Sequence, residues 1–370
     1  MAAIRGETLD RVPVSFYEIN GLDEHTQDTD PYNIYSHPSW IPLIELAREK
    51  TDRIVMRSVE FTGQPTHPVE AVTTWQGTGD HASRFTRRTV LVGSRRLTSL
   101  SRRDRDVATD WEIEHLLKNV ADLKAYLALP VHSPGGEPVV SGVLRAEAEL
   151  GDSGIVMIDT PDPLCLAAAL FDMATYTVIA MTEQRLFHAL LERFAEQLYY
   201  KTDAVARALP GRLWRIYGPE YASPPFLPPA LFKEYVVRYD TPMVAAIQRH
   251  GGYARMHSHG RLKAILDLIV STGCSGLDPL EPPPQGDVSL AYVRQHFGKD
   301  LVLFGNLEAS DLENLPTAAF EQKIIQALQE GTAGSGRGFV LMPSSCPYGR
   351  ELSALAYANY GKMVEVVENF

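Results

Sequence analysis

Eight short β-rich runs alternate with helical stretches along this chain of 370 residues. Runs such as LVLFG and GFVLM are almost continuously apolar, which is typical of parallel strands buried on both faces. Alternating strands and helices predict an α/β fold with a parallel sheet, and eight strands favour closure into a (β/α)₈ TIM barrel, a single domain over 1–370. The predicted strands are 13–19, 53–59, 155–159, 213–217, 253–257, 276–280, 301–305 and 338–342, and the predicted helices are 38–50, 182–208, 228–249, 261–271, 288–297 and 317–330.

An insertion at about 60–150 breaks this alternation after the second strand. Its segment RFTRRTVLVGSRRLTSLSRRDRD alternates around Gly93, which predicts an antiparallel hairpin, and a short helix is expected around 112–127. The arginines form either a docking surface for an acidic partner or a solvated face balanced by nearby acidic residues. They are Arg84, Arg87, Arg88, Arg95, Arg96, Arg102, Arg103 and Arg105.

The charge balance and the chain start restrict the class of protein. With 46 acidic against 35 basic residues, the net charge of -11 argues against nucleic acid as the main partner. The start MAAIRGETLDR lacks the apolar segment of a signal peptide, and three cysteines are too few for a disulfide framework. The longest apolar runs are much shorter than a helix needs to cross a bilayer. We therefore expect a soluble, cytoplasmic protein without a membrane partner.

Polar side chains follow the predicted strands at the end where barrels of this type place their active sites. They are Glu220 after the fourth strand, His257 and His259 after the fifth, Asp278 and Glu281 after the sixth, Asn306 and Glu308 after the seventh, and Cys346 after the eighth. Because these strand ends share one rim, the sequence predicts an active site there.

Two histidines and one cysteine of this rim suggest a metal site. Imidazole nitrogen and thiolate sulfur are the usual zinc ligands, and three protein ligands with an open fourth position are typical of catalytic zinc. His257, His259 and Cys346 are the expected ligands, with Glu220 as a fourth, exchangeable one. The alternative is that the histidines are ordinary polar loop residues and that Cys346 packs as a small apolar side chain.

Five segments resemble the uroporphyrinogen decarboxylase superfamily, and together they extend over nearly the whole chain. They are DRVPVSFYEI, WEIEHLLKNVADLKAYL, GPEYASPPFLPPALFKEYV, RMHSHGRLKAILDLIVSTGCSGLDPLEP and FGKDLVLFGNLEASDLENL. The resemblance is most specific over 211–347 and implies a (β/α)₈ barrel, in agreement with the strand count.

The superfamily contains two chemistries. True decarboxylases carry an early arginine-rich segment that grips carboxylates, whereas FYEINGLDEHTQDTDPYNIY has no arginine and contains Glu18, Asp23, Glu24, Asp28 and Asp30. The cobalamin-linked methyltransferases hold zinc with an "H-x-C…C" pattern, which His257 and Cys346 match while His259 stands at the first cysteine. This branch implies zinc and a corrinoid cofactor, here supplied by a separate corrinoid-carrying protein because no segment looks like a cobalamin-binding module.

The histidine at position 259 bears on the substrate. Imidazole in place of thiolate removes a negative charge from the ligand set, and a more electropositive zinc better polarises an oxygen. This favours transfer of a methyl group from a small methoxylated donor to the corrinoid (O-demethylation). Glu220 is expected to act as exchangeable ligand or acid-base group, and the substrate is expected to be positioned by Tyr217, Asn306 and Tyr348. The alternatives are transfer from a methylcorrinoid to a thiol or folate, porphyrinogen decarboxylation, and a non-catalytic small-molecule-binding barrel. Related barrels often pair, so a homodimer is one possible assembly, but the sequence points to no particular interface.

Overall fold

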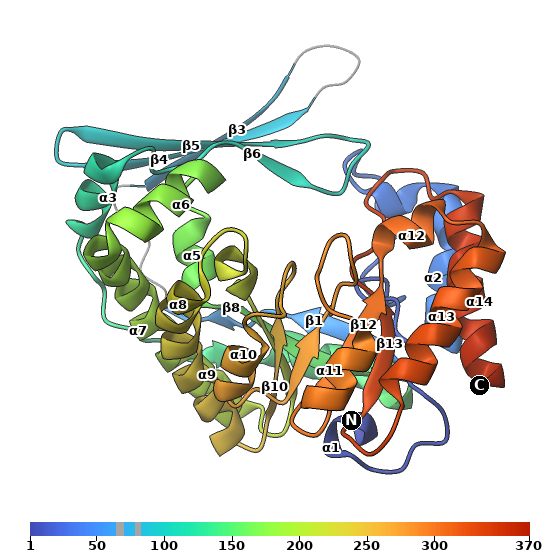
Figure 1. The fold of residues 1–370 in the computed structure, drawn as a ribbon. Helices are drawn as coiled ribbons and strands as arrows, with labels where there is room; N and C mark the ends of the chain where they lie inside the picture. The colour runs from blue at the N-terminus through green and yellow to red at the C-terminus, as the bar shows by residue number, and fades with distance from the viewer. Residues whose placement is uncertain (64–69, 78–82) are drawn as a thin grey trace.

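The structure is a computed structural model that describes residues 1–63, 70–77 and 83–370. Seven parallel strands form a curled sheet at its centre, in the order β1-β8-β9-β10-β11-β12-β13 (Figure 1). Each strand lies beside the next one along the chain, as βαβ connections require. The strands are β1 (Arg53–Arg57), β8 (Gly154–Pro161), β9 (Leu213–Tyr217), β10 (Tyr253–His257), β11 (Gly276–Asp278), β12 (Val302–Leu307) and β13 (Phe339–Pro343).

The segment predicted as the first strand, 13–19, joins the two edges of this sheet through a single bridge. Val14 pairs with Leu341 in β13, and the Asp52 amide donates to the Val14 carbonyl at 2.8 Å, just before β1. The strand prediction is wrong beyond this bridge, because Tyr17 has a φ of 59° and the chain turns back between Phe16 and Ile19. The seven strands and this bridge together give the TIM-barrel arrangement of the predicted fold.

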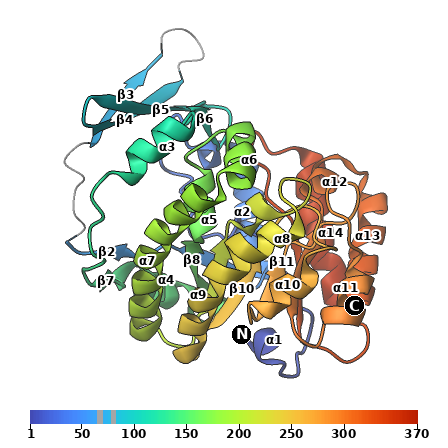
Figure 2. The same ribbon diagram turned by 60° about the vertical axis from the view of Figure 1, so that its left-hand side comes forward.

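Helices cover the outside of the sheet (Figures 1 and 2). Polar side chains at the start of several helices accept a backbone N–H, as Asn119, Asp162, Ser289 and Ser353 do. The helices are α1 (Ala2–Arg5), α2 (Ile41–Lys50), α3 (Val120–Leu127), α4 (Ser141–Leu150), α5 (Pro163–Ala168), α6 (Met173–Thr182), α7 (Gln184–Ala208), α8 (Pro229–Phe232), α9 (Arg238–Arg249), α10 (Leu266–Ser271), α11 (Leu290–Phe297), α12 (Ala309–Asn314), α13 (Thr317–Gly331) and α14 (Ala354–Asn369). A π-helical turn (Lys233–Val237) joins α8 to α9.

The apolar core has two parts. The larger cluster lies between the sheet and the helices and includes Trp40, Trp214 and Phe232. The smaller one gathers side chains from β8, β9, β12 and β13, such as Met157 and Phe304, and fills the interior of the barrel. Among helices in the described ranges, none has the length and apolar character that a bilayer span requires.

The insertion forms an antiparallel sheet of four strands, which confirms and extends the predicted hairpin. Its order is β3-β4-β5-β6, with β3 (Glu70–Gln76), β4 (Arg84–Val92), β5 (Arg95–Arg103) and β6 (Asp110–Glu114). A two-stranded ribbon of β2 (Glu60–Phe61) and β7 (Pro138–Val139) flanks it. The helix expected around 112–127 begins only at Val120, because the alternating residues 110–114 pair with β5 as a strand.

The four-stranded sheet lies on the side of the barrel where the strands end. The Ala108 amide, just before β6, donates to the Tyr348 carbonyl at 2.8 Å, and Val107 bridges to Gly349 in the loop after β13. In Figure 1 this sheet extends over the top of the molecule, while α1 lies at the opposite end. The insertion therefore stands beside the rim that carries the predicted active site.

Candidate functional site

His257 and His259 lie side by side at the end of β10, as the sequence predicts. Their ring centroids are 4.6 Å apart and their planes are nearly perpendicular. His257 is buried, whereas the side chain of His259 is 36% exposed. Each ring has a carboxylate at Nδ1: Asp278 lies 2.7 Å from His257, and Glu281 lies 2.7 Å from His259. In a neutral ring, a carboxylate at Nδ1 selects the tautomer that carries its proton on Nδ1, which leaves Nε2 free to bind a ligand.

Asp278, the last residue of β11, is shared between His257 and a buried arginine. The Arg255 Nε lies 2.8 Å from one carboxylate oxygen, and His257 Nδ1 lies 2.7 Å from the other. Burial alone would raise the pKa of Asp278, but the charges of Arg255 and His257 lower it to about 2. Asp278 therefore stays ionised and fixes the orientation of His257.

Glu281 holds the second imidazole in a similar way. One oxygen pairs with His259, and the other accepts the Gly260 amide at 2.7 Å. Burial by itself would lower the pKa of His259, but the hydrogen bond to Glu281 and the negative charges of Glu281, Glu220 and Asp278 together outweigh it and raise that pKa. Nearby Glu308, buried after β12, has its pKa raised to about 7 by burial and by the charge of Glu281. This rim therefore contains a carboxyl group that holds a proton near neutral pH.

Cys346 is buried in the loop after β13, and its sulfur faces a carboxylate. The thiol donates to the Glu18 Oε2 at 3.3 Å. Burial and the negative charge of Glu18 raise the pKa of Cys346 well above the ordinary thiol value. A thiolate is the zinc-binding form, so Cys346 would have to lose this proton to bind a metal.

The histidines and the cysteine thus meet the requirements of a zinc site only in part. The two imidazoles with carboxylates at Nδ1 have the arrangement typical of histidine ligands. Within 1–63, 70–77 and 83–370, however, no three His, Cys, Asp or Glu side chains are arranged to hold a metal ion. The two imidazoles lie together, whereas Cys346 contacts Glu18 and does not complete a group of three among the described residues.

Glu220 lies on the same rim, in a short turn (Pro219–Ala222) after β9. Its carboxylate accepts the Gly218 amide at 3.0 Å, and its charge contributes to raising the pKa of His259. Gly218 has a φ of 126°, and a Cβ there would lie 2.1 Å from an Asp162 carboxylate oxygen. Only glycine fits at this position, so the backbone conformation that presents Glu220 depends on it.

The three residues predicted to position a substrate occupy different environments. Tyr217 ends β9 within the barrel, where the Arg215 guanidinium lies 5.3 Å from its ring. Asn306 lies near the end of β12 and lines a cavity of about 200 Å³ together with Glu308. Tyr348 is 55% exposed in the loop after β13, beside the four-stranded sheet.

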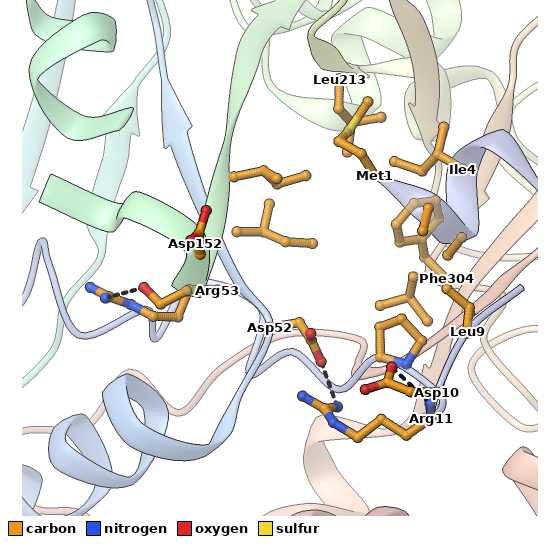
Figure 3. A pocket seen from close by; sticks show the side chains of 18 residues that line it. Met1, Ile4, Leu9, Asp10, Arg11, Asp52, Arg53, Asp152, Leu213 and Phe304 are labelled. Atoms are coloured by element: carbon orange, nitrogen blue, oxygen red, sulfur yellow. Dashed lines mark hydrogen bonds and ion pairs between the residues drawn. The ribbon is translucent and has the colours of Figure 1, made fainter. Parts of the chain in front are cut away.

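A further cavity, of about 250 Å³, lies at the opposite end of the barrel, where the strands begin. Figure 3 shows Met1, Ile4, Leu9, Leu213 and Phe304 around it, with the Arg11–Asp52 ion pair at its edge. Active sites of this fold lie at the other end of the strands, and conserved features at this end serve stability. We therefore assign this cavity no catalytic role.

The sequence did not predict which residues hold the two histidines in place. Asp278 and Glu281 were recognised as rim residues, but their bonds to the histidines follow only from the register of β10 and β11. Arg255 was missed because a charged residue inside a barrel strand gives no functional pattern by itself. Its alternation with His257 on β10, two residues away, was the available signal.

Comparisons with known proteins agree with this architecture. A methyltransferase from Methanosarcina mazei shares 15% identity with a TM-score of 0.61, covering 100% of this chain and 97% of that chain, which shows a common fold. A D-psicose 3-epimerase crystallised with D-fructose shares 11% identity with a TM-score of 0.32 over 62% of this chain and 81% of that chain, a likeness too weak to carry an argument. No curated protein matches the sequence.

The family match covers most of the barrel. Residues 112–352 match the family described as uroporphyrinogen decarboxylase (URO-D), which extends from β6 of the insertion to the loop after β13. This range contains both histidines, their carboxylate partners and Cys346, and it agrees with the resemblance of the sequence segments. The chain belongs to the uroporphyrinogen decarboxylase (URO-D) family.

Proposed function

We propose that this chain is a zinc-dependent methyltransferase that moves a methyl group between a small methoxylated substrate and the cobalt of a corrinoid held by a separate protein. The observation that carries the proposal is the pair of imidazoles, His257 and His259, each bonded at Nδ1 to a carboxylate on the active rim of the barrel. The fold shared with the M. mazei methyltransferase is consistent with it. All three cysteines are free, which fits the proposed cytoplasmic location.

The proposed zinc ligands are His257, His259 and Cys346, with Glu220 as the exchangeable fourth group. Zinc would supply a Lewis acid for the oxygen that leaves when the methyl group is transferred. Cys346 would first give up the proton that it now shares with Glu18, at a sulfur–oxygen distance of 3.3 Å. Tyr217, Asn306 and Tyr348 are proposed to orient the substrate by hydrogen bonds.

Decarboxylation of a porphyrinogen is less well supported, because the arginines inside the barrel are already neutralised. Arg215 makes two bonds to Asp159, at 2.6 and 3.0 Å, and Arg255 pairs with Asp278. A substrate with several carboxylates would also meet Glu18 and Glu24. The reverse transfer, from a methylcorrinoid to a thiol or folate, is the alternative that a methyl-transfer assay run in both directions distinguishes.

Zinc analysis and a methyl-transfer assay test the proposal together. We expect one zinc per chain in the wild type, lost in the His257→Ala, His259→Ala and Cys346→Ala variants and kept in Cys274→Ala, a cysteine outside the site. We also expect methoxylated compounds to change the absorbance of a cobalt(I) corrinoid when the enzyme is added. An active protein without zinc would overturn the metal assignment. Stoichiometric zinc without methyl transfer in either direction would instead favour a binding barrel.

The carboxylate behind His259 gives a second test of the zinc site. Glu281→Gln keeps the size of the side chain but removes the charge that holds His259 Nδ1. Loss of such a partner lowers metal affinity by about 10- to 100-fold. Competition with a chelator measures this change, and Glu45→Gln on the exposed face of α2 is the control. Unchanged affinity in Glu281→Gln would contradict the role of His259 as a ligand.

A further inference from the structure

The start of the chain inserts one aromatic side chain into the barrel beside the histidine pair. Tyr17 is 6% exposed and belongs to the cluster that fills the barrel interior. Its ring stacks on that of His257, with the centroids 6.1 Å apart and the planes 26° from parallel. Its hydroxyl accepts a hydrogen bond from the Arg215 Nη1 at 2.6 Å, and Arg215 is held in turn by Asp159. The hydroxyl of Tyr17 is therefore anchored, while its ring lies against His257.

The imidazole of His257 needs a contact of this kind because its hydrogen bond fixes only one of its ring atoms. The bond at Nδ1 ties the ring to Asp278 but does not by itself fix the plane of the ring. The torsion that turns a histidine ring has a broad range of allowed values. His259 meets His257 with its plane at 85°, so it offers no flat contact. The stacked ring of Tyr17 is the contact that opposes rotation of His257.

The backbone at Tyr17 points to a function for this contact. Its φ of 59° is rare for a bulky side chain. The turn around it is closed by the Ile19 amide, which donates to the Phe16 carbonyl at 3.2 Å. Residues in such conformations persist only where the surrounding structure requires them, and they cluster at active sites. Glycine would adopt this φ readily but would bring no ring to His257.

The next residue of the same turn reaches the cysteine of the proposed site. The Cys346 thiol donates to the Glu18 Oε2 at 3.3 Å. Tyr17 and Glu18 thus contact His257 on β10 and Cys346 after β13, and β11 and β12 lie between these two strands in the sheet. One turn near the start of the chain therefore touches both parts of the site.

We propose that Tyr17 is a positioning residue of the candidate site, whose stacked ring fixes the plane of the His257 imidazole and with it the direction of Nε2. Tyr17 acts through His257, whether Nε2 binds a metal ion or an atom of the substrate. The inference rests on the proposed function, because it takes His257 to be an active-site residue. Since the flat ring carries this role, phenylalanine should replace Tyr17, and a non-planar apolar side chain should not.

The nitrogen resonances of the His257 ring in metal-free protein, recorded at alkaline pH so that neutral rings are observed, test the proposal. With the proton on Nδ1, toward Asp278, the two ring nitrogens of the wild type should give well-separated signals. We expect Tyr17→Phe to keep this separation. Tyr17→Leu and Tyr17→Met should bring the two signals closer together, because a ring that turns away from Asp278 exchanges between tautomers. Tyr235→Leu is the control, since it removes a buried tyrosine packed among the helices and should leave the His257 signals unchanged.

Zinc affinity, measured by competition with a chelator, gives a second readout in the same variants. We expect Tyr17→Leu and Tyr17→Met to bind zinc roughly tenfold more weakly, as when another partner of a ligating histidine is removed. Tyr17→Phe and Tyr235→Leu should bind it like the wild type.

Two results would overturn the proposal. One is a Tyr17→Leu or Tyr17→Met variant whose His257 signals equal those of the wild type. The other is a Tyr17→Phe variant that loses the separation, because the bond to Arg215 and not the ring would then hold His257. A wild type that binds no zinc would contradict the proposed metal site alone, since the nitrogen signals are read in the metal-free protein.

Discussion

The Asp278→Ala variant is expected to lose about 3–5 kcal/mol of unfolding free energy, because it leaves a buried guanidinium without its counter-ion. Arg255 is 1% exposed, its Nε lies 2.8 Å from Asp278, and its Nη2 has no hydrogen-bond partner among the described residues. The pKa of Asp278, lowered to about 2 by Arg255 and His257, shows how strongly the ionised carboxylate is favoured in this environment. Urea denaturation of the wild type and the variant measures the difference.

The same substitution should also disturb the histidine pair. His257 would lose the carboxylate at Nδ1 and with it the fixed tautomer, so zinc affinity should fall as well. Asp267→Ala, on an exposed position of α10, is the control and should change stability by less than about 0.5 kcal/mol. If Asp278→Ala unfolds at nearly the wild-type urea concentration, Arg255 does not depend on this carboxylate.

The barrel strands were predictable because buried parallel strands are almost continuously apolar. Runs such as LVLFG and GFVLM lie in β12 and β13, one or two residues from the predicted bounds. The start of the chain was not, since 13–19 contains the right residue types but turns at Tyr17, whose positive φ no pattern signals. Residues 112–114 were assigned to a helix although D-W-E-I-E at 110–114 alternates with period two, which is the pattern of the strand that forms.

The sequence predicted at which end of the barrel the candidate site lies and which residues stand there, but not all of their contacts. His257 and His259 meet as expected, because they are neighbours at the end of one strand. Cys346 and Glu18 are 328 residues apart, and their contact depends on how the chain start closes the barrel, which sequence spacing does not determine. The three-ligand zinc set remains a proposal for this reason: two of its members are adjacent in the sequence, while the third depends on long-range packing.

A second large effect is expected from two buried carboxyl groups, one at the start of α5 and one in α9. Asp162 and Asp240 are fully buried, and Asp240 has no hydrogen-bond partner in the described part of the chain. Burial raises the pKa of both groups; the charge of Asp240 adds to this effect at Asp162, and that of Glu220 at both. The folded protein therefore retains protons that the unfolded chain releases near the usual aspartate pKa of about 3.9.

The sign of the pH dependence follows from these raised pKa values. Stability from a carboxyl whose folded pKa is raised is complete below the unfolded pKa and is lost as pH rises through the folded pKa. For each retained proton the unfolding free energy falls by about 1.4 kcal/mol per pH unit across that window. Asp240→Asn cannot ionise, so we expect it to be more stable than the wild type at neutral and mildly alkaline pH, with the advantage shrinking toward pH values near 4.

Denaturation of the wild type and Asp240→Asn at several pH values measures the contribution of Asp240 together with its coupling to Asp162 and Glu220. More distant titrating groups are common to both proteins and cancel in the difference. Asp267→Asn, which removes an exposed carboxylate on α10, should track the wild type at every pH. A constant difference between Asp240→Asn and the wild type would mean that Asp240 is ionised in the folded protein. Its charge would then need a compensating partner, and the described structure provides none for either of its carboxylate oxygens.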